Sequence, residues 1–98
     1  MEKIGSILRP QPSVGGEFFA AAVVATANDW LQQVLHLSPL DASAKSVRHG
    51  TLMIETEHGA VAGLIVRRTD DLIEYVNKTI ERQFRKPNAV AKVATRRR

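Results

Sequence analysis

The stretch AKSVRHGTLMIETE, residues 44–57, decides the fold because it reads as two short strands, Ala44–Arg48 and Thr51–Glu57, joined by a two-residue turn. Such a turn needs positive φ angles, which Gly50 adopts freely and His49 tolerates better than most residues. The turn sets Arg48 opposite Thr51, and alternation then places side chains on two faces. One face holds Val47, Leu52 and Ile54, and the other holds Met53, Glu55 and Glu57. We expect the first face to pack on a core and the second to face water.

Amphipathic helices are predicted on both sides of this hairpin. Upstream, residues 17–37 carry an apolar stripe at steps of three and four that ends before Ser38-Pro39. Downstream, residues 71–84 carry a second stripe, with Thr69 or Asp71 as candidate N-caps. The first stripe comprises Phe19, Val23, Ala27, Trp30 or Leu31, and Val34; the second comprises Leu72, Ile73, Val76, Ile80 and Phe84. Trp30 is expected in the core, and Glu74 with Lys78 and Glu81 with Arg85 are expected as ion pairs.

Two further segments complete the predicted order. Residues 58–66, HGAVAGLIV, fit a buried helix and a buried strand equally well, whereas residues 89–95 suggest a last strand. The expected class is therefore α+β, a small three-stranded sheet with two or three helices packed on one face. Residues 1–16 are predicted to be a short lead-in and a flexible linker, and residues 17–98 one domain with a basic C-terminal end.

Composition excludes several functions. The chain has 98 residues, 44% of them apolar, and no cysteine, which suits one modest core and excludes disulfides, thiolate metal sites and thiol nucleophiles. The three histidines, His36, His49 and His58, have no metal-ligand spacing. Neither a Walker loop nor a nucleophile elbow is present. We therefore expect a protein that is not an enzyme and that has no cofactor, metal ion or small-molecule substrate.

The basic residues gather in the C-terminal third. Residues 1–65 carry four basic and six acidic side chains, whereas residues 66–98 carry ten basic and four acidic ones. The candidate binding set is Arg67, Arg68, Lys78, Arg82, Arg85, Lys86, Lys92, Arg96, Arg97 and Arg98. Arginine suits forked contacts with phosphates or carboxylates, and the poor supply of nearby aromatic residues favours non-specific, salt-sensitive DNA binding. A solvated, charged surface without a nucleic-acid partner explains the same residues equally well.

The last three arginines are expected to extend freely from the fold. Their replacement by glutamate should then abolish DNA binding and leave the melting temperature nearly unchanged.

One segment resembles an export signal. Residues 18–27 are apolar and end in Ala25-Thr26-Ala27, a pattern of signal-peptidase sites, so a small exported protein is one alternative. However, Glu17 adjoins the apolar run, and the helical stripe continues past the cleavage point. The run is also about half of the ~20 residues that a bilayer span requires. We therefore expect a cytoplasmic protein without membrane contact.

The stretch from Trp30 to Val93 resembles the DciA family of bacterial replicative-helicase loaders. The resemblance lies in the order of Trp30 and Val34, the strand 50–54, the small apolar run after His58, the Leu72-Ile73 and Val76-Asn77 pairs with Ile80, and a final basic strand with valine. It implies a fold like the type II KH domain, with the order α-β-β-α-α-β. It also implies a role in bringing the replicative helicase, as protein partner, onto single-stranded DNA.

Three features depart from the patterns of the helicase-loader family and of KH domains. Leu35 stands where the family usually has glycine, and residues 60–62 lack the family's frequent aromatic residue. The Gly-x-x-Gly loop with which KH domains clamp RNA is absent, since Gly59 and Gly63 are one residue too far apart. RNA binding in the KH manner is therefore disfavoured, and a general nucleic-acid-binding protein without a helicase role stays an alternative.

Overall fold

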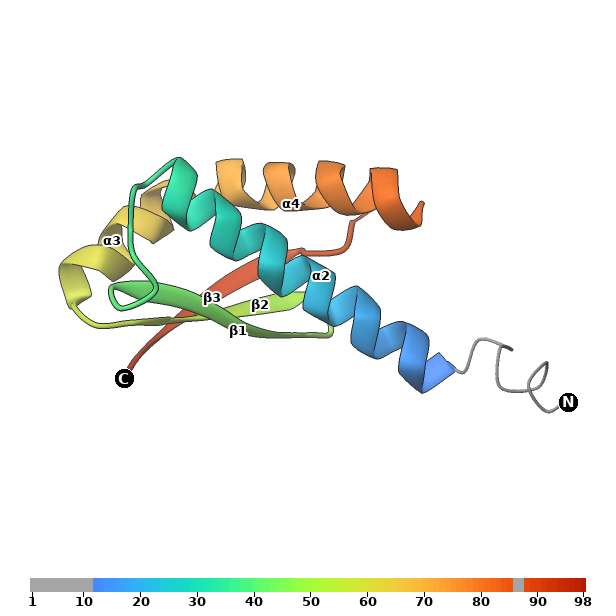
Figure 1. Cartoon of the computed structure of the whole chain (residues 1–98). Helices are drawn as coiled ribbons and strands as arrows, with labels where there is room; N and C mark the ends of the chain where they lie inside the picture. The colour runs from blue at the N-terminus through green and yellow to red at the C-terminus, as the bar shows by residue number, and fades with distance from the viewer. Residues whose placement is uncertain (1–11, 86–87) are drawn as a thin grey trace, which may run out of the picture.

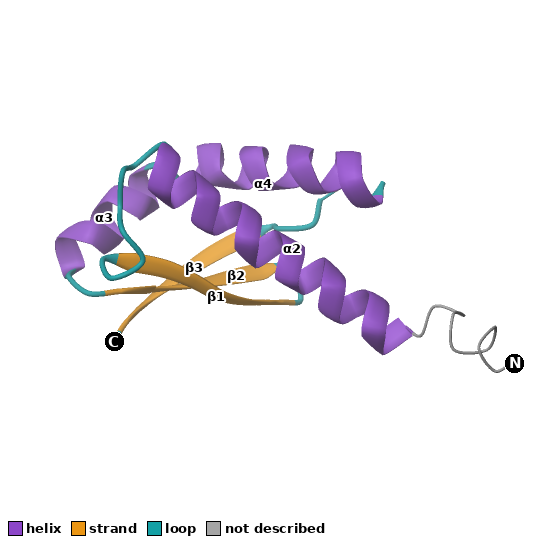
Figure 2. Cartoon of the chain, in the orientation of Figure 1, coloured by secondary structure: helices purple, strands orange, loops and turns teal. Residues whose placement is uncertain are grey.

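A computed structural model of the chain describes residues 12–85 and 88–98. The elements follow the order α-β-β-α-α-β (Figure 1), which confirms the expected α+β layout. They are α2 (Pro12–Gln33), β1 (Ala42–Arg48), β2 (Thr51–Thr56), α3 (Gly59–Arg67), α4 (Thr69–Phe84) and β3 (Lys92–Arg97). The helices lie on one side of the sheet and leave its other face without a helix (Figure 2). Residues 1–11 of the predicted lead-in and linker, and Lys86 of the candidate set, lie outside the described residues.

The sheet is mixed, with strand order β1-β2-β3. β1 and β2 are antiparallel, and their register places Arg48 opposite Thr51 and Val47 opposite Leu52, as predicted. The turn residues His49 and Gly50 have φ angles of 52° and 79°, so the predicted left-handed turn is confirmed. β3 returns parallel to β2, a pairing that requires the long connection through α3 and α4.

Two asparagines fasten the helices to the sheet region. Asn28 of α2 accepts a hydrogen bond from the N–H of Ala44 at 2.7 Å and donates to its carbonyl oxygen at 3.4 Å. Asn77 of α4 repeats this arrangement with Val90, at 2.8 and 3.0 Å. Ala44 lies where the β1 register shifts at a bulge, and Val90 lies outside any strand. Each asparagine therefore satisfies backbone groups at a point where the sheet leaves them unpaired.

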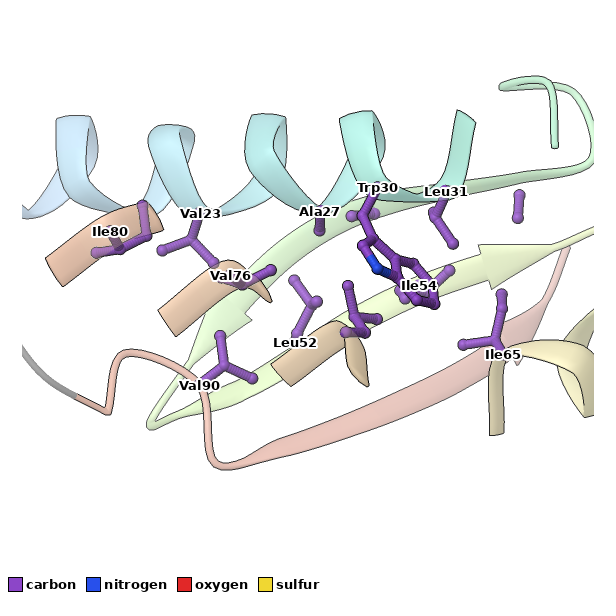
Figure 3. Packing of buried hydrophobic residues seen from close by; sticks show 13 residues of the cluster. Val23, Ala27, Trp30, Leu31, Leu52, Ile54, Ile65, Val76, Ile80 and Val90 are labelled. Atoms are coloured by element: carbon purple, nitrogen blue, oxygen red, sulfur yellow. The ribbon is translucent and has the colours of Figure 1, made fainter. Parts of the chain in front are cut away.

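The hydrophobic core fills the space between the helices and the sheet (Figure 3). Trp30 is 3% exposed, which confirms its predicted place in the core. Val34 is 39% exposed, because α2 ends one residue before it. The fully or nearly fully buried members are Val23, Ala27, Trp30, Leu31, Ala42, Ala44, Leu52, Ile54, Ile65, Leu72, Val76, Ile80 and Val90. Both predicted apolar stripes, one on α2 and one on α4, thus contribute residues to the core.

The first helix differs from the predicted range 17–37 at both ends. It begins at Pro12, inside the predicted linker, where the missing N–H of proline costs no helical hydrogen bond. It ends at Gln33, and His36 takes a left-handed conformation with φ 58°. The N–H of Leu37 then donates to the carbonyl of Leu31 at 3.0 Å. The helix therefore stops through this local turn before it reaches Ser38-Pro39.

The ambiguous segment forms α3, and Arg68 alone separates it from α4. The predicted caps of α4 do not form, since Thr69 and Asp71 are already helical and Arg68 occupies the N-cap without a side-chain capping hydrogen bond. The Thr69 hydroxyl donates backwards to the carbonyl of Ile65 at 3.2 Å. The acidic residues of the first turn, Asp70 and Asp71, instead favour the helix start electrostatically.

The last strand begins later than predicted. Residues 89–95 carry the apolar pattern, but β3 spans residues 92–97. Val90 is 2% exposed and held by the Asn77 amide, so it fills the core below α4 and does not join the sheet. An apolar residue that packs before a strand is indistinguishable by periodicity from a strand residue.

Candidate nucleic-acid interface

The predicted basic residues do not form one continuous patch. The end of α4 and the start of β3 lie on one side of the molecule, whereas the C-terminus lies on the other (Figure 1). Arg67 and Arg68 precede α4, about 25 Å from Arg85 at a rise of 1.5 Å per helical residue. The structure therefore separates the described candidates into groups on α4, at the α3–α4 junction and along β3.

The group on α4 consists of Lys78, Arg82 and Arg85, which we call the α4 cationic cluster. A step of four residues brings Lys78 and Arg82 to one helix face, as predicted, and Arg85 follows the helix as its C-cap. Together with Glu81 they line a shallow surface cavity of about 510 Å³. The described lining, three cations around one carboxylate, carries a net positive charge.

Ion pairs leave most of this cluster available. The Lys78 Nζ lies 3.0 Å from a carboxylate oxygen of Glu74, the predicted pair, but both side chains are more than 60% exposed. Exposed pairs of this kind are weak. The predicted Glu81–Arg85 pair is absent among the described residues, because Arg85 leaves the helix with φ 58°. Within the described residues Arg82 and Arg85 have no acidic partner.

The two arginines at the α3–α4 junction, Arg67 and Arg68, have different surroundings. Arg68 Nε lies 2.8 Å from a carboxylate oxygen of Asp71, and its guanidinium carbon lies 5.7 Å from the centre of the Trp30 ring. Arg68 thus covers the core tryptophan by a cation–π contact. Arg67 is exposed and pairs with no acidic group in the described part of the chain. Of the two, Arg67 is the one available to a partner.

The C-terminal arginines are anchored more firmly than predicted. Parallel pairing aligns Arg96 with Glu55, and their side chains meet at 2.6 Å. Arg98 approaches Glu55 at 3.7 Å and Glu57 at 3.6 Å. The hydrogen bond from Arg96 lowers the pKa of Glu55, with further help from the charges of Lys45 and Arg98. Glu55 and Glu57 were expected to be solvated strand residues, whereas they are the anchors of the chain end.

Arg98 also binds backbone. Its guanidinium donates to the carbonyl oxygens of Pro39 at 2.9 Å and Leu40 at 3.2 Å, and to the Ser43 hydroxyl at 3.3 Å. The chain end is therefore tied to the loop before β1. Replacing the last three arginines by glutamate is now expected to lower the melting temperature, because it would place new carboxylates beside Glu55 and Glu57.

Sequence reasoning missed Arg48, a basic residue on the helix-free face of the sheet, and its position beside the predicted candidate Lys92. Arg48, Thr51 and Lys92 form a row across the three strands, with about 10 Å between the outer two Cα atoms. Arg48 and Lys92 are both exposed. Hairpin pairing alone relates Arg48 to Thr51. The position of Lys92 depends on the parallel register of β3, for which the sequence has no signal.

Aromatic residues are absent from the helix-free face. All five in the sequence, Phe18, Phe19, Trp30, Tyr75 and Phe84, lie on α2 or α4. The sheet therefore has no platform on which bases could stack. In residues 12–85 and 88–98 no group of three or more acidic or histidine side chains is placed to hold a metal ion.

The apolar helix residues bear on membrane contact and export. No helix in the described part of the chain is both long and apolar enough to cross a bilayer. Ala25-Thr26-Ala27 lies inside α2, with Ala27 fully buried. Cleavage there would remove Val23 and Ala27 from the core.

Fold and surface together define a small α+β module with a cationic cluster on its last helix. Comparison with known protein families finds no match to this chain, and comparison with curated proteins finds none.

Proposed function

We propose that this protein is a non-enzymatic accessory module of DNA replication that contacts single-stranded DNA through the α4 cationic cluster and binds the replicative helicase. The observation that carries the DNA part is the pair Arg82 and Arg85, exposed and without acidic partners among the described residues, beside a surface cavity. Guanidinium groups bind phosphate oxygens in a forked geometry, which suits them to a nucleic-acid backbone.

The expected binding is non-specific. Near the cluster Phe84 packs edge-to-face against Phe19 and Trp30 is buried, which leaves Tyr75 as the exposed aromatic ring of α4, so phosphate contacts dominate over base stacking. Three cations on a single strand give a salt slope of about −2, so affinity should fall roughly 20-fold between 50 and 200 mM salt.

The helicase part rests on two supports. The first is the resemblance of residues 30–93 to helicase loaders, and the second is the α-β-β-α-α-β order that this resemblance implies. Fold alone does not define function, so the helicase needs its own experiment. The cytoplasm is the compartment in which such a protein would act.

The DNA contact is tested by fluorescence anisotropy with a labelled oligo-dT strand at several salt concentrations. The double variant R82E/R85E should lose at least tenfold in affinity. The matched control R67E/R97E carries the same change in charge on exposed side chains away from the cluster, and it should stay within about threefold of the wild type. Equal losses in both variants would mean that net charge, and not the cluster, attracts DNA.

The helicase contact is tested by size-exclusion chromatography of the two purified proteins. A concentration-dependent complex is expected at tens of micromolar, and its absence would remove the helicase from the proposal. DNA binding without that complex would favour the second candidate, a general nucleic-acid-binding protein. The unpaired arginines of α4 support that candidate as well, since they need no protein partner.

A further inference from the structure

The outer edge of β3 is an open row of backbone hydrogen-bonding groups. The N–H of Lys92 donates to Gly50 and the N–H of Arg98 to Thr56, both toward β2. The backbone N–H and C=O groups of successive strand residues point to opposite edges of the strand. The backbone groups of the even-numbered residues of β3 therefore bind β2, and those of the odd-numbered residues face outward. No other described strand pairs with β3 on that side. Val93, Thr95 and Arg97 therefore present their N–H and C=O groups to a partner.

The side chains beside this edge are basic. Lys92 and Arg96 are exposed and lie on the helix-free face, since they pair in register with Thr51 and Glu55 of β2. They are separated by about 13 Å, the span of four strand residues. Arg96 already binds Glu55, yet its guanidinium has five donors and can take a second carboxylate. Arg97, on the opposite face, is exposed and unpaired among the described residues.

We propose that this edge binds an extended acidic peptide segment of another protein, which adds a fourth strand to the sheet beside β3. Backbone groups at regular strand spacing select a polypeptide, because a nucleic acid cannot form a β-ladder. The basic side chains select acidic residues. In the bound peptide two carboxylates four residues apart, on one face of the strand, would meet Lys92 and Arg96.

A second copy of this chain is a poorer occupant. Edge-to-edge pairing of two β3 strands would bring Lys92, Arg96 and Arg97 of one copy against the same residues of the other. Like charges across a strand pair are destabilising, and lysine on an edge strand is a common protection against such pairing. The same basic side chains attract an acidic segment, so the edge of β3 favours negatively charged partners over positively charged ones.

The probe is the acetylated, amidated peptide TEVTVET, with two glutamates four residues apart, titrated into the full chain and followed by two-dimensional amide NMR. We expect saturable binding and slowed hydrogen exchange at the amides of Val93, Thr95 and Arg97. The amides of Ala94 and Arg96, which already bond to β2, should change little. The peptide TKVTVKT should bind at least tenfold more weakly.

Two sets of changes separate a β-ladder from simple charge attraction. Peptides methylated at their odd-numbered or their even-numbered amide nitrogens keep their charge, and one of the two should lose binding at least tenfold. On the protein, Thr95→Pro removes an outward N–H but no bond to β2, and should abolish binding, whereas Thr95→Val should retain it. The methylated peptides need no protein variant, so they decide the matter even if Thr95→Pro misfolds.

The proposal is overturned if TEVTVET does not bind at about 1 mM, a free energy near −4 kcal/mol, or if both methylated peptides bind as well as the parent. It is also overturned if oligo-dT slows hydrogen exchange at the same three amides, or if sedimentation shows that two copies of the chain associate through β3 and no peptide binds there. It does not depend on the proposed DNA contact, because R82E/R85E should keep the peptide site and lose only DNA binding.

Discussion

Replacing Asn77 by alanine removes both hydrogen bonds that this side chain makes to Val90, at 2.8 and 3.0 Å. Val90 is 2% exposed, so water has little access to the lost partners' places, and each abandoned backbone group costs about 1–2 kcal/mol. The better helix propensity of alanine returns roughly half a kcal/mol. The net loss is about 1.5–3.5 kcal/mol, and the melting temperature should fall by roughly 6–28 °C in a domain of this size.

Thermal unfolding followed by circular dichroism measures this loss, with Gln83→Ala as the matched control. Gln83 lies on the exposed face of the same helix, and its replacement should change the melting temperature by only a few degrees. Asn77→Asp keeps the acceptor for the Val90 N–H but loses the donor, so a carboxylate faces a carbonyl at neutral pH. Acid should partly restore this variant relative to the wild type, because a protonated carboxyl group can donate again. The reasoning fails if Asn77→Ala melts within 2 °C of the wild type.

Three other outcomes are expected. Because the pKa of Glu55 is lowered in the fold, its contribution to folding stability is complete above its ordinary pKa of 4.5 and disappears as pH falls through the lower folded-state value. The difference in unfolding free energy between wild type and Glu55→Gln, measured by urea unfolding, should therefore close between neutral and strongly acidic pH. A constant difference would contradict this. Thr56→Val should raise stability by about 1 kcal/mol, because the buried Thr56 hydroxyl has no hydrogen-bond partner, and a loss in urea unfolding would show that the hydroxyl is satisfied. Gly50→Ala should lower the free energy of unfolding by about 1–2 kcal/mol because of the φ of 79° alone, since a Cβ there would lie at an ordinary contact distance of 3.6 Å from Ala91. An unchanged melting temperature would contradict the need for a left-handed turn at this position.

The elements that the sequence predicts well are those set by local rules. The His49-Gly50 turn and the alternation around it determine the hairpin register, and the stripe of α4 determines its buried face. Residues 58–66 stay undecided by pattern, because only packing of Ile65 against the rest of the core distinguishes a helix from a strand. Tertiary packing, which periodicity does not contain, resolves such cases.

Long-range pairing accounts for what could not be predicted about the candidate site. The basic helix face on α4 follows from spacing alone, and the structure places its three side chains together. By contrast, the capture of Arg96 by Glu55 depends on the parallel register between β2 and β3, across 41 residues of sequence. The same register brings Lys92 into line with Arg48. The sequence alone therefore predicts an unpaired basic C-terminal segment, because the acidic residues beside it in the sheet are known only from the strand register.

The stacking of Arg68 on Trp30 gives the molecule a natural optical reporter. This is the only tryptophan in the chain, and it lies under the single residue between α3 and α4. Any event that lifts the guanidinium or opens the helix junction exposes the indole to water and shifts its emission to longer wavelength. Opening of the helix junction and global unfolding can thus be timed in the unlabelled protein.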